Sequence, residues 1–401
     1  MKVLYLVSSY PYEHDPYGGV FFQNQAEALR RCGVDIEVLV VTPWTPPFVE
    51  FYSRALSGLS ELPSERCING VPVRVVRYPM LPKMGASALS HPWIAWAVKR
   101  VLREIPDLIH GNYGYPLGAV AARLGQELNI HAVVTLRGDD VNTLAARSAK
   151  HRAILRQTAD SATLIAVSRA LCEKTYELIG TRPTYLPVGI QVTRFPSRES
   201  RAELRASLGI AASSAALLFV GNFIVEKGLR ELIQALQMLQ QSSVLYAAGA
   251  GPLEAELRAT PGVHVLGALP NEQVARYMKA CDLLVLPTYN EGLPNVLLEA
   301  GATGIPIVAT NVGGIPQLLG ADGGLMVGPR DPRALVDAIH CCLADSEGAR
   351  ERSERLRERI FRDYDIDRNA RRLRDLYALL LECGAGCNAR LVHDQEGVSS
   401  Q

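Results

Sequence analysis

The chain alternates between short runs of consecutive apolar residues and longer segments in which apolar residues recur at helical spacing. The runs at 3–7, 217–220 and 283–286 show no polar alternation, which is typical of strands buried on both faces of a parallel sheet. An amphipathic segment at 21–31 comes after the first run, and Gly33 follows it in the sequence as a candidate C-cap. Strands that alternate with helices in this way predict an α/β fold built from βαβ units.

Residues 282–314 show this pattern most clearly. They predict a strand, a turn that carries Glu291, a helix that carries Glu299, a second strand and a glycine loop at Gly313. Pro294 stands where a proline is expected in the first turn of a helix, because the N–H that it lacks has no partner there in any case. The stretch is therefore expected to form one βαβ unit with two carboxylates in it.

The start of this predicted helix is a candidate ligand site. The backbone N–H groups of Leu293, Asn295 and Val296 are expected to point outward with the positive end of the helix dipole, which attracts anionic or oxygen-rich ligands. Glu299 lies deeper along the helix than Glu291, in the same crevice outside the strand ends. The simpler alternative makes both of them ordinary solvated acids. Against it, Glu299 is embedded in an apolar helix, where an acid without a partner is costly to bury.

Length and composition limit the classes of function. A chain of 401 residues exceeds the size at which one hydrophobic core stops growing, so two domains are expected. Lys and Arg number 42 against 41 Asp and Glu, which gives no basic footprint for nucleic acid. The 8 cysteines form no framework of close pairs, which favours reduced cytosolic thiols, and Cys383 and Cys387 lack the further ligands of a zinc site. The run at 3–7 is too short for a signal peptide or a membrane span.

Three further loops contain candidate ligand residues. Gly18 and Gly19 precede the first helix, where glycines let a backbone approach a phosphate closely. Lys227 follows the strand at 217–220, and a cation there can neutralise the charge of an anionic ligand; the alternative is a surface lysine. Arg137 follows another strand and stays protonated, so it cannot be a general base, and we expect it to steady phosphate or acceptor oxygens.

These residues resemble the Glu-x7-Glu signature of the retaining glycosyltransferases of family 4, which have the GT-B fold. The signature contains a Glu-Gly pair, here Glu291 and Gly292, then a Glu-Ala pair at 299–300 and a Gly-x-Pro at 304–306. The opening Ser-Tyr-Pro, the Gly-Val-Phe loop that follows it and the Arg-Gly-x-Asp at 137–140 are similar to the teichuronic-acid and exopolysaccharide branch of that family. The similarity extends over most of residues 1–382.

The resemblance implies a domain organisation. Two Rossmann-like domains would face each other across a cleft, the GT-B arrangement. Residues 1–195 would form the acceptor-binding domain and residues 196–365 the donor-binding domain. A C-terminal helix at 366–382 would cross back to the first domain, and residues 383–401 would form a loose tail.

The resemblance also implies an activity. A hexosyltransferase of this kind moves a sugar from a nucleotide diphosphate sugar, such as a UDP-sugar, to an acceptor hydroxyl with retention of the anomeric configuration. It needs neither a metal nor another cofactor, and the leaving phosphate itself takes the acceptor proton in a front-face mechanism. The acceptor is a carbohydrate, a lipid-linked molecule or a small molecule, in bacterial cell-surface polysaccharide or glycoconjugate synthesis. The enzyme is expected in the cytoplasm, with peripheral contact with the inner membrane surface and no nucleic acid partner.

The roles of single residues follow from the same resemblance. Glu299 would bind the ribose hydroxyls, Glu291 the sugar hydroxyls, and Lys227 the leaving diphosphate. Lys227, Glu291 and Arg137 form the expected catalytic set. The expected donor-binding set is Gly18, Gly19, Asn222, Lys227, Leu269, Glu291, Gly292, Leu293, Pro294, Asn295, Val296 and Glu299.

One position departs from the family pattern, because Asn222 stands where the family has an arginine. Either Lys227 carries the charge, helped by Arg137, or the chain is a non-catalytic nucleotide-sugar-binding subunit. An epimerase or hydrolase on the same fold would need a further acid and base pair, which is not found. A dinucleotide-dependent oxidoreductase is disfavoured because no Gly-x-Gly-x-x-Gly follows the first strand of either domain.

Two segments allow alternative interpretations. The aromatic and proline-rich residues 43–62 suit either a lid on the acceptor side or a packed Ω-loop. The helix expected at 92–105 combines Trp93 and Trp96 with basic residues such as Arg100. It suits either an interfacial membrane helix or a packed helix with a solvated basic face.

Overall fold

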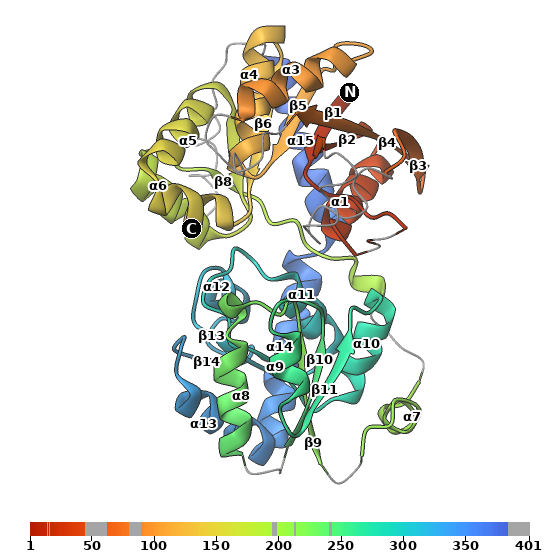
Figure 1. Cartoon of the computed structure of the whole chain (residues 1–401), viewed down its shortest axis with the longest axis vertical. Coiled ribbons are helices and arrows are strands. Elements are labelled where there is room, and N and C mark those ends of the chain that lie inside the picture. Colours follow the sequence, from red (N-terminus) through yellow and green to blue (C-terminus); the bar gives the residue numbers. More distant parts are fainter. Residues whose placement is uncertain are drawn as a thin grey trace. The chain divides into compact units, whose positions relative to one another are not determined.

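The computed structural model describes residues 1–13, 15, 17–44, 62–79, 90–194, 199–211, 214–239 and 243–383. Met1–Val188 and Ile366–Gln401 belong to one compact unit, unit 1, and Gly189–Asp365 form a second, unit 2. Each unit is built on its own largely parallel sheet flanked by helices (Figure 1). The predicted α/β class with two Rossmann-like units is therefore confirmed. The 43–62 segment, apart from its ends, and the predicted tail beyond Cys383 lie outside the described residues.

The sheet of unit 1 is parallel throughout except for an antiparallel hairpin at one edge, formed by its first two strands in the spatial order. Its central strands consist almost wholly of buried residues, as expected for a parallel sheet covered on both faces. In spatial order the strands are β3 (Glu65–Ile68), β4 (Val71–Pro79), β2 (Asp35–Trp44), β1 (Lys2–Val7), β5 (Leu108–Asn112), β6 (His131–Leu136), β7 (Thr163–Ala166) and β8 (Thr184–Tyr185).

Helices connect these strands. The first of them begins after Gly19, whose left-handed backbone (φ 74°) ends the preceding loop, and it has Arg30 and Arg31 in its last turn, where cations suit the helix dipole. The α-helices of unit 1 are α1 (Val20–Arg31), α3 (His91–Val101), α4 (Ala119–Leu128), α5 (Ala149–Ser161), α6 (Arg169–Ile179) and α15 (Ile366–Cys383). Short π-helical turns lie at η2 (Gly114–Gly118) and η3 (Asp140–Ala145).

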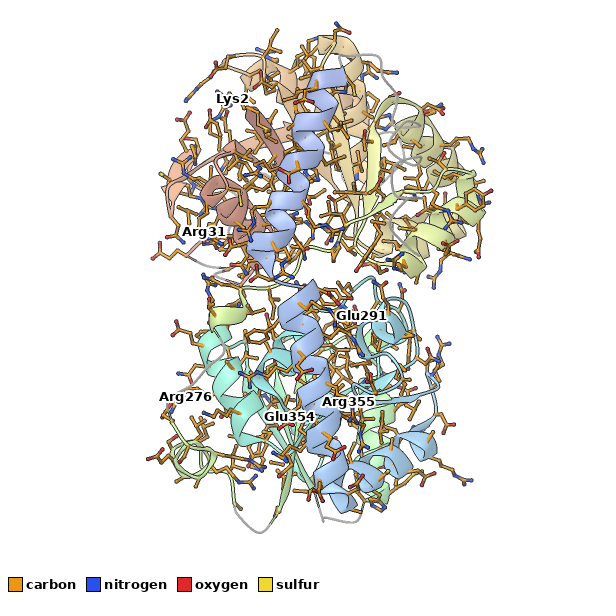
Figure 2. All side chains as sticks on the ribbon, turned by 180° about the vertical axis from the view of Figure 1, so that it is seen from behind. Lys2, Arg31, Arg276, Glu291, Glu354 and Arg355 are labelled. Carbon is orange, nitrogen blue, oxygen red and sulfur yellow. The ribbon has the colours of Figure 1, made fainter. Side chains whose placement is uncertain are left out.

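The helix α15 follows unit 2 in the sequence but packs against α1 in unit 1. Leu373 and Tyr377 on its inner face are fully buried. Arg31, labelled in Figure 2, lies at the end of α1. It forms an ion pair with Asp367 at the start of α15, with 2.6 Å between Nη2 and Oδ1. The prediction that a C-terminal helix returns to the first domain is confirmed.

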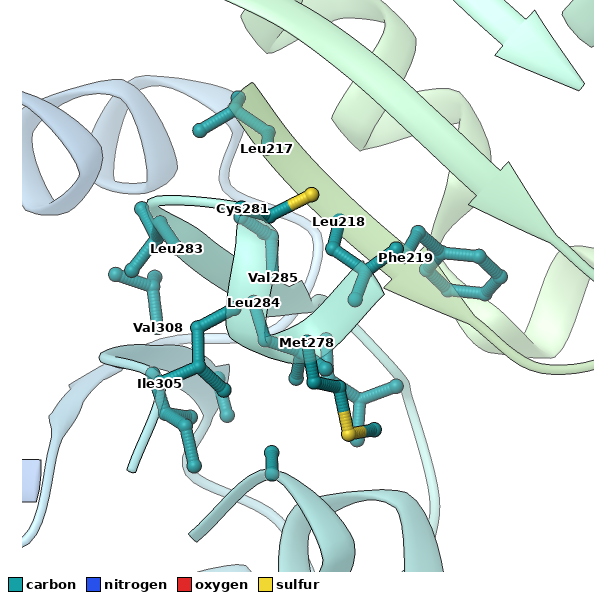
Figure 3. Close-up of a cluster of buried hydrophobic side chains, with 14 of the residues drawn as sticks. Leu217, Leu218, Phe219, Met278, Cys281, Leu283, Leu284, Val285, Ile305 and Val308 are labelled. Carbon is teal, nitrogen blue, oxygen red and sulfur yellow. The ribbon is translucent and has the colours of Figure 1, made fainter. Parts of the chain in front are cut away.

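The sheet of unit 2 has six strands, all parallel. The predicted strand at 283–286 is completely buried, and its side chains pack with Leu217, Leu218, Phe219 and Met278 (Figure 3). In spatial order the strands are β11 (Val263–Gly267), β10 (Ser243–Ala248), β9 (Ala215–Val220), β12 (Leu283–Leu286), β13 (Ile307–Thr310) and β14 (Leu325–Val327).

The helices of unit 2 follow the same alternation. They are α7 (Arg201–Ser207), α8 (Leu229–Met238), α9 (Glu254–Arg258), α10 (Asn271–Ala280), α11 (Asn295–Thr303), α12 (Ile315–Leu319), α13 (Pro332–Ala344) and α14 (Ser346–Asp363). A short 3-10 turn, η5 (Val225–Lys227), precedes α8. Across the part of the chain that the structure describes, no helix combines the length and the apolar character needed to cross a bilayer.

The division between the units falls a few residues before the predicted boundary at Phe195, which itself lies outside the described residues. Ile190 and Val192 are buried in the core of unit 2. The backbone N–H of Ile190 donates to the carbonyl of Tyr364, at 2.9 Å, near the other end of that unit. Apolar burial thus assigns the segment just before Phe195 to unit 2.

The strand order in unit 2 identifies a place for a ligand. From β9 the chain moves outward through β10 to β11, and it then returns to the other side of β9 and moves outward from β12 to β14. The loops after β9 and β12 therefore flank a topological switch point, the place where open α/β sheets bind ligands outside the carboxyl ends of their strands. In unit 1 the corresponding point lies between β1 and β5.

Candidate active site

An ion pair occupies the switch point of unit 2. Lys227 ends the η5 turn after β9, and Glu291 lies in the loop after β12. The Nζ atom of Lys227 lies 2.5 Å from Oε1 of Glu291, and the two side chains are only 23% and 12% exposed. Figure 2 shows Glu291 apart from Glu354 and Arg355, which lie on the solvent side of α14. Two residues of the predicted catalytic set thus lie in direct contact.

Hydrogen bonds between the two loops hold this pair in place. The backbone N–H of Tyr289 and the hydroxyl of Thr288 both donate to the carbonyl of Glu226, at 2.8 and 3.1 Å. The hydroxyl of Thr310, at the end of β13, donates to the carbonyl of Thr288 at 2.5 Å. Three adjacent strand ends are therefore tied together. Sequence reasoning did not identify Thr288 or Thr310, because a single hydroxyl after an apolar run is no recognisable motif.

The glycine loop after β13 packs directly on the backbone of Glu291. A Cβ atom built on Gly313 would lie 1.9 Å from the carbonyl oxygen of Glu291, and Gly313 has φ of +55°. Both the close approach and the left-handed backbone require glycine here. The predicted glycine loop thus supports the turn that carries the carboxylate.

Backbone donors gather at the start of α11. The N–H groups of Gly292, Leu293, Asn295 and Val296 make no hydrogen bond within the described part of the chain. Pro294 is the N-cap of the helix rather than its first-turn residue, since its backbone is extended and helical geometry begins at Asn295. Leu293 therefore precedes the helix, which corrects the expectation by one position. The donors together with the helix dipole form an electropositive surface beside Lys227 and Glu291.

Glu299 lies on α11 and is half-buried. Within the described residues its carboxylate has neither a hydrogen bond nor an ion pair. Burial raises the pKa of Glu299 from 4.5 to about 7. A half-buried acid without a partner destabilises the free protein. Such an acid is suited to accept hydrogen bonds from ligand hydroxyl groups.

The two remaining donor-binding candidates of unit 2 lie at the ends of other strands. Asn222 follows β9 and is exposed, and its side chain makes no hydrogen bond in the described structure. Leu269 follows β11 and packs, half-buried, against the core of the unit. Both lie on the carboxyl side of the sheet, so the strand topology gathers all the donor-binding candidates of unit 2 on one side.

Unit 1 has its own cluster at the carboxyl side of its sheet, centred on Arg137. The guanidinium donates to Oδ1 of Asn112, at 3.0 Å from Nε and 2.7 Å from Nη2, and to Oε1 of Gln25 at 2.7 Å from Nη2. It also stacks on the rings of Phe21 and Phe22, with 5.0 and 4.8 Å to the centroids. These partners come from β5 and α1, so no local sequence pattern marks them.

The charge of Arg137 is not neutralised by these contacts. Its hydrogen-bond partners within the described residues are all neutral, and Nη1 makes no hydrogen bond there. Asp140 nearby is buried and turned to the backbone, where it accepts N–H bonds from Gly114 and Gly138 at 2.7 and 2.9 Å. Burial raises the pKa of Asp140, while the N–H bonds act in the opposite direction. An oriented guanidinium with free donors is suited to bind an anion.

The predicted glycine pair lies beside this cluster. The N–H of Gly18 donates to Oδ1 of Asp15 at 2.8 Å. A Cβ atom on Gly19 would lie 2.5 Å from the carbonyl oxygen of Ser9. Since Phe21 and Phe22 belong to the helix that begins just after Gly19, the glycine loop and Arg137 share one end of unit 1.

A buried polar network lies behind Arg137. His110 is fully buried, and its Nε2 lies 2.6 Å from the hydroxyl of Thr135 while its Nδ1 is hydrogen-bonded to the hydroxyl of Tyr377 on α15. Burial, together with the charge of Arg137, lowers the pKa of His110 to about 3. His110 is therefore neutral at physiological pH and serves to join α15 to the sheet.

Known proteins match both units of the chain. Residues 18–189 match the family described as "Glycosyl transferase 4-like domain", and residues 214–345 match the one described as "Glycosyl transferases group 1". The glycosyltransferase TuaC of Bacillus subtilis (strain 168), assigned to teichuronic acid biosynthesis, is 33% identical over 382 residues. That alignment covers 94% of this chain and 98% of TuaC.

Solved structures resemble the whole architecture. Sucrose-phosphate synthase from Thermosynechococcus elongatus has a TM-score of 0.79 at 22% identity, over 96% of this chain and 100% of that one. The Anabaena protein HepE in complex with UDP-glucose has a TM-score of 0.73 at 20% identity, over 94% of this chain and 99% of that one. At these identities the likeness concerns the fold, which is GT-B.

Proposed function

Because the chain belongs to the group 1 glycosyl transferases and is a hexosyltransferase of the GT-B fold, we propose that it uses a nucleotide diphosphate sugar and retains the anomeric configuration. The observation that carries this proposal is the arrangement at the switch point of unit 2. There the Lys227–Glu291 pair lies at the start of α11, whose first backbone donors make no hydrogen bond within the described residues, and Glu299 further along α11 has no partner in that part of the chain either. This arrangement offers positive potential for phosphates and acceptors for hydroxyl groups.

In the proposed reaction the bond between the anomeric carbon and the diphosphate oxygen breaks, and the acceptor oxygen bonds to that carbon on the same face. The acceptor proton passes to the leaving phosphate oxygen, so the step needs no protein nucleophile. Glu291 uses one Nζ–H of Lys227, which leaves two N–H bonds of the ammonium for the phosphate. Lys227 and the N–H groups at the start of α11 stabilise the charge that develops on the leaving group.

The carboxylates hold the rest of the donor. Oε2 of Glu291 makes no hydrogen bond within the described residues and accepts from sugar hydroxyls. Glu299 accepts from the ribose hydroxyls, and the backbone near Leu269 flanks the nucleobase. Because Lys227 and the backbone donors supply the positive potential that a divalent cation supplies in other enzymes, we expect transfer without added metal.

In unit 1, Arg137 and the glycine loop would bind anionic groups of the donor or the acceptor. The free Nη1 donors of Arg137 suit a phosphate or the oxygens of the acceptor, and Gly18 and Gly19 let the backbone approach a phosphate closely. Gln25 and Asn112 hold the guanidinium in one orientation, which reduces the cost of ordering it on binding.

The relatives favour particular substrates. The UDP-glucose complex of HepE supports a UDP-sugar as the donor. The assignment of TuaC to teichuronic acid biosynthesis supports an acceptor that belongs to a cell-surface polysaccharide, either free or lipid-linked. We therefore propose that the enzyme works in the cytoplasm with peripheral contact with the inner membrane.

Calorimetry with UDP-, GDP-, ADP- and TDP-sugars in the absence of metal tests the donor site. We expect one of them to bind, and Glu299→Ala to weaken its affinity about tenfold or more, since a hydrogen bond to a charged group contributes about 1.5–3 kcal/mol. Glu354→Ala, which removes an exposed acid of α14, is the control and should leave the affinity unchanged. If no nucleotide sugar binds, or if both variants weaken binding equally, the proposed donor site is wrong.

A non-catalytic sugar-nucleotide-binding subunit is the second candidate, and it is favoured by the exposed Asn222 where the family has an arginine. A glycosyltransferase and a binding subunit would both bind the nucleotide sugar, but only the glycosyltransferase would transfer the sugar. A protein that binds the donor but does not transfer or hydrolyse it, and that gains transfer in Asn222→Arg, would be the binding subunit. Transfer by the native chain would exclude this alternative.

A further inference from the structure

The helix α3 presents two tryptophans to solvent. Trp93 and Trp96 lie nearly one turn apart and are 63% and 51% exposed, while the opposite side of the helix is buried in unit 1. The chain has 3 tryptophans, so most of its indole groups lie on this one helix face. The helix itself is packed, as one of the two interpretations of the sequence expects, but its two tryptophans take no part in that packing. Large neighbouring aromatic side chains that are exposed to solvent indicate a surface that binds a partner or a membrane.

Basic side chains lie beside Trp96 and in the last turn of α3. The guanidinium of Arg100 lies 4.8 Å above the ring of Trp96 and has no acidic partner within the described residues. Lys99 shares the carboxylate of Glu127 with Arg123 on the neighbouring α4, both at 2.8 Å. This group of Lys99, Arg100, Arg123 and Glu127 thus contains three cations and one acid and has a net positive charge.

This combination matches the headgroup region of an anionic bilayer. Indoles prefer the boundary between hydrocarbon and water, and Lys and Arg side chains reach past an apolar surface to anionic headgroups. A second copy of the chain fits less well, because a two-fold contact through this face would bring the excess cations of both copies together. Charge complementarity thus favours lipid over self-association.

We infer that the α3 surface, formed by Trp93, Trp96, Lys99, Arg100 and Arg123, docks unit 1 on an anionic lipid bilayer. The contact is peripheral, with the indoles at the level of the headgroups and the cations beside lipid phosphates. The inference does not rest on the proposed donor or on sugar transfer, since it uses only the outer surface of α3 and α4. It gives the expected membrane contact a location and a lipid preference.

Sedimentation with lipid vesicles tests the inference directly. We expect the native chain to bind vesicles of equal parts phosphatidylcholine and phosphatidylglycerol and to bind pure phosphatidylcholine at least tenfold more weakly. Tryptophan emission should shift to the blue on binding. The double variant Trp93→Ser/Trp96→Ser and the single variant Arg100→Glu should each lower the partition coefficient about tenfold or more, and added salt should weaken native binding.

A matched control lies on another helix of the same unit. Tyr176 on α6 is 49% exposed under the guanidinium of Arg182, so Tyr176→Ser removes an exposed aromatic group from a similar setting and should not change vesicle binding. Circular dichroism and thermal unfolding check that each variant is folded, which is expected because these side chains are exposed.

The inference is wrong if the native protein stays in the supernatant with anionic vesicles, or if the double variant binds them as well as the native chain does. It is also wrong if the native protein is a dimer without lipid and the double variant is a monomer.

Discussion

The ammonium of Lys227 and the carboxylate of Glu291 lie 2.5 Å apart although 64 positions separate the two residues. The carbonyl of Glu226 joins their two loops, because it accepts hydrogen bonds from the N–H of Tyr289 and the hydroxyl of Thr288. Because both side chains are mostly buried, removing either one leaves the other charge unpaired. We therefore expect the pair to behave as a unit, so that the effects of the two single substitutions do not add.

Lys227→Ala should lower the kcat of sugar transfer about a hundredfold or more, the usual effect of losing a group that stabilises transition-state charge. The KM for the donor should change much less, because the charge on the diphosphate is greatest as it leaves. Steady-state kinetics measure both. Lys174→Ala is the control, since that lysine pairs with Glu177 on the exposed side of α6. An unchanged kcat would remove Lys227 from the catalytic set.

Donor affinity should depend on pH through Glu299. The pKa of this carboxyl in the free protein is about 7, and only the ionised form accepts two ribose hydroxyl bonds. The dissociation constant should therefore rise as the pH falls below about 7, by nearly tenfold for each pH unit. Calorimetry of the native chain and of Glu299→Gln measures this, and the variant should bind weakly with no such dependence. A parallel pH dependence in the variant would assign the titration to another group.

Glu299→Gln should also stabilise the protein without ligand. The pKa of the carboxyl is raised from 4.5 in the unfolded chain to about 7 in the folded one, so ionisation favours unfolding as the pH rises through this window. Above pH 7 the cost is fully present, and one pKa unit corresponds to about 1.4 kcal/mol, so the variant should gain at least about 1 kcal/mol. Below pH 4.5 the difference should vanish. Denaturant unfolding at several pH values checks the sign.

Gly313→Ala should weaken donor binding by displacing Glu291. The new Cβ would lie 1.9 Å from the carbonyl oxygen of Glu291, so the turn must move. Gly304→Ala is a matched control, because Gly304 also has a positive φ, of +82°, but has open space around its Cβ position. Backbone strain should cost both variants about 1 kcal/mol of stability, and Gly313→Ala should lose more because of its clash. Only Gly313→Ala should lose affinity for the nucleotide sugar, and equal losses would contradict the supporting role of the loop.

Tyr377→Phe should destabilise unit 1. It removes the hydroxyl that is hydrogen-bonded to Nδ1 of His110 and leaves that buried nitrogen unpaired, which costs about 1–3 kcal/mol. Urea unfolding measures the change. Tyr176→Phe, at an exposed site on α6, should have no effect. If the two variants unfold alike, the bond between α15 and the sheet contributes nothing to stability.

The sequence predicted those parts of the structure that depend on local pattern. The apolar run at 283–286 indicated a strand buried on both faces, and Gly313 and Pro294 marked the loop and the helix start around it. The helix start was misplaced by one residue, because a proline suits both the N-cap and the first turn. The resemblance to a family placed Lys227 and Glu291 in one catalytic set, but their direct contact depends on strand order and was not predicted.

Contacts between distant elements had no signal in the sequence. Asn112 and Gln25 look like ordinary polar residues, one ending a strand and the other within a helix, yet they orient Arg137. His110 and Tyr377 are 267 positions apart. The division before Ile190 was missed for a related reason, since the apolar residues that follow it suit the core of either unit until the fold assigns them to unit 2.

The return of α15 to unit 1 has a consequence for synthesis on the ribosome. Unit 2 is one continuous segment and can complete its core once residue 365 has emerged. Unit 1 is synthesised first, but its buried hydrogen bond between His110 and Tyr377 cannot form until Tyr377 has been synthesised. The usual vectorial order of folding, from the N-terminus onward, is therefore reversed for the final step. In the nascent chain, the apolar surface of unit 1 beside α1 therefore stays exposed until α15 has been synthesised. Chaperones that bind exposed apolar surface would act during this interval.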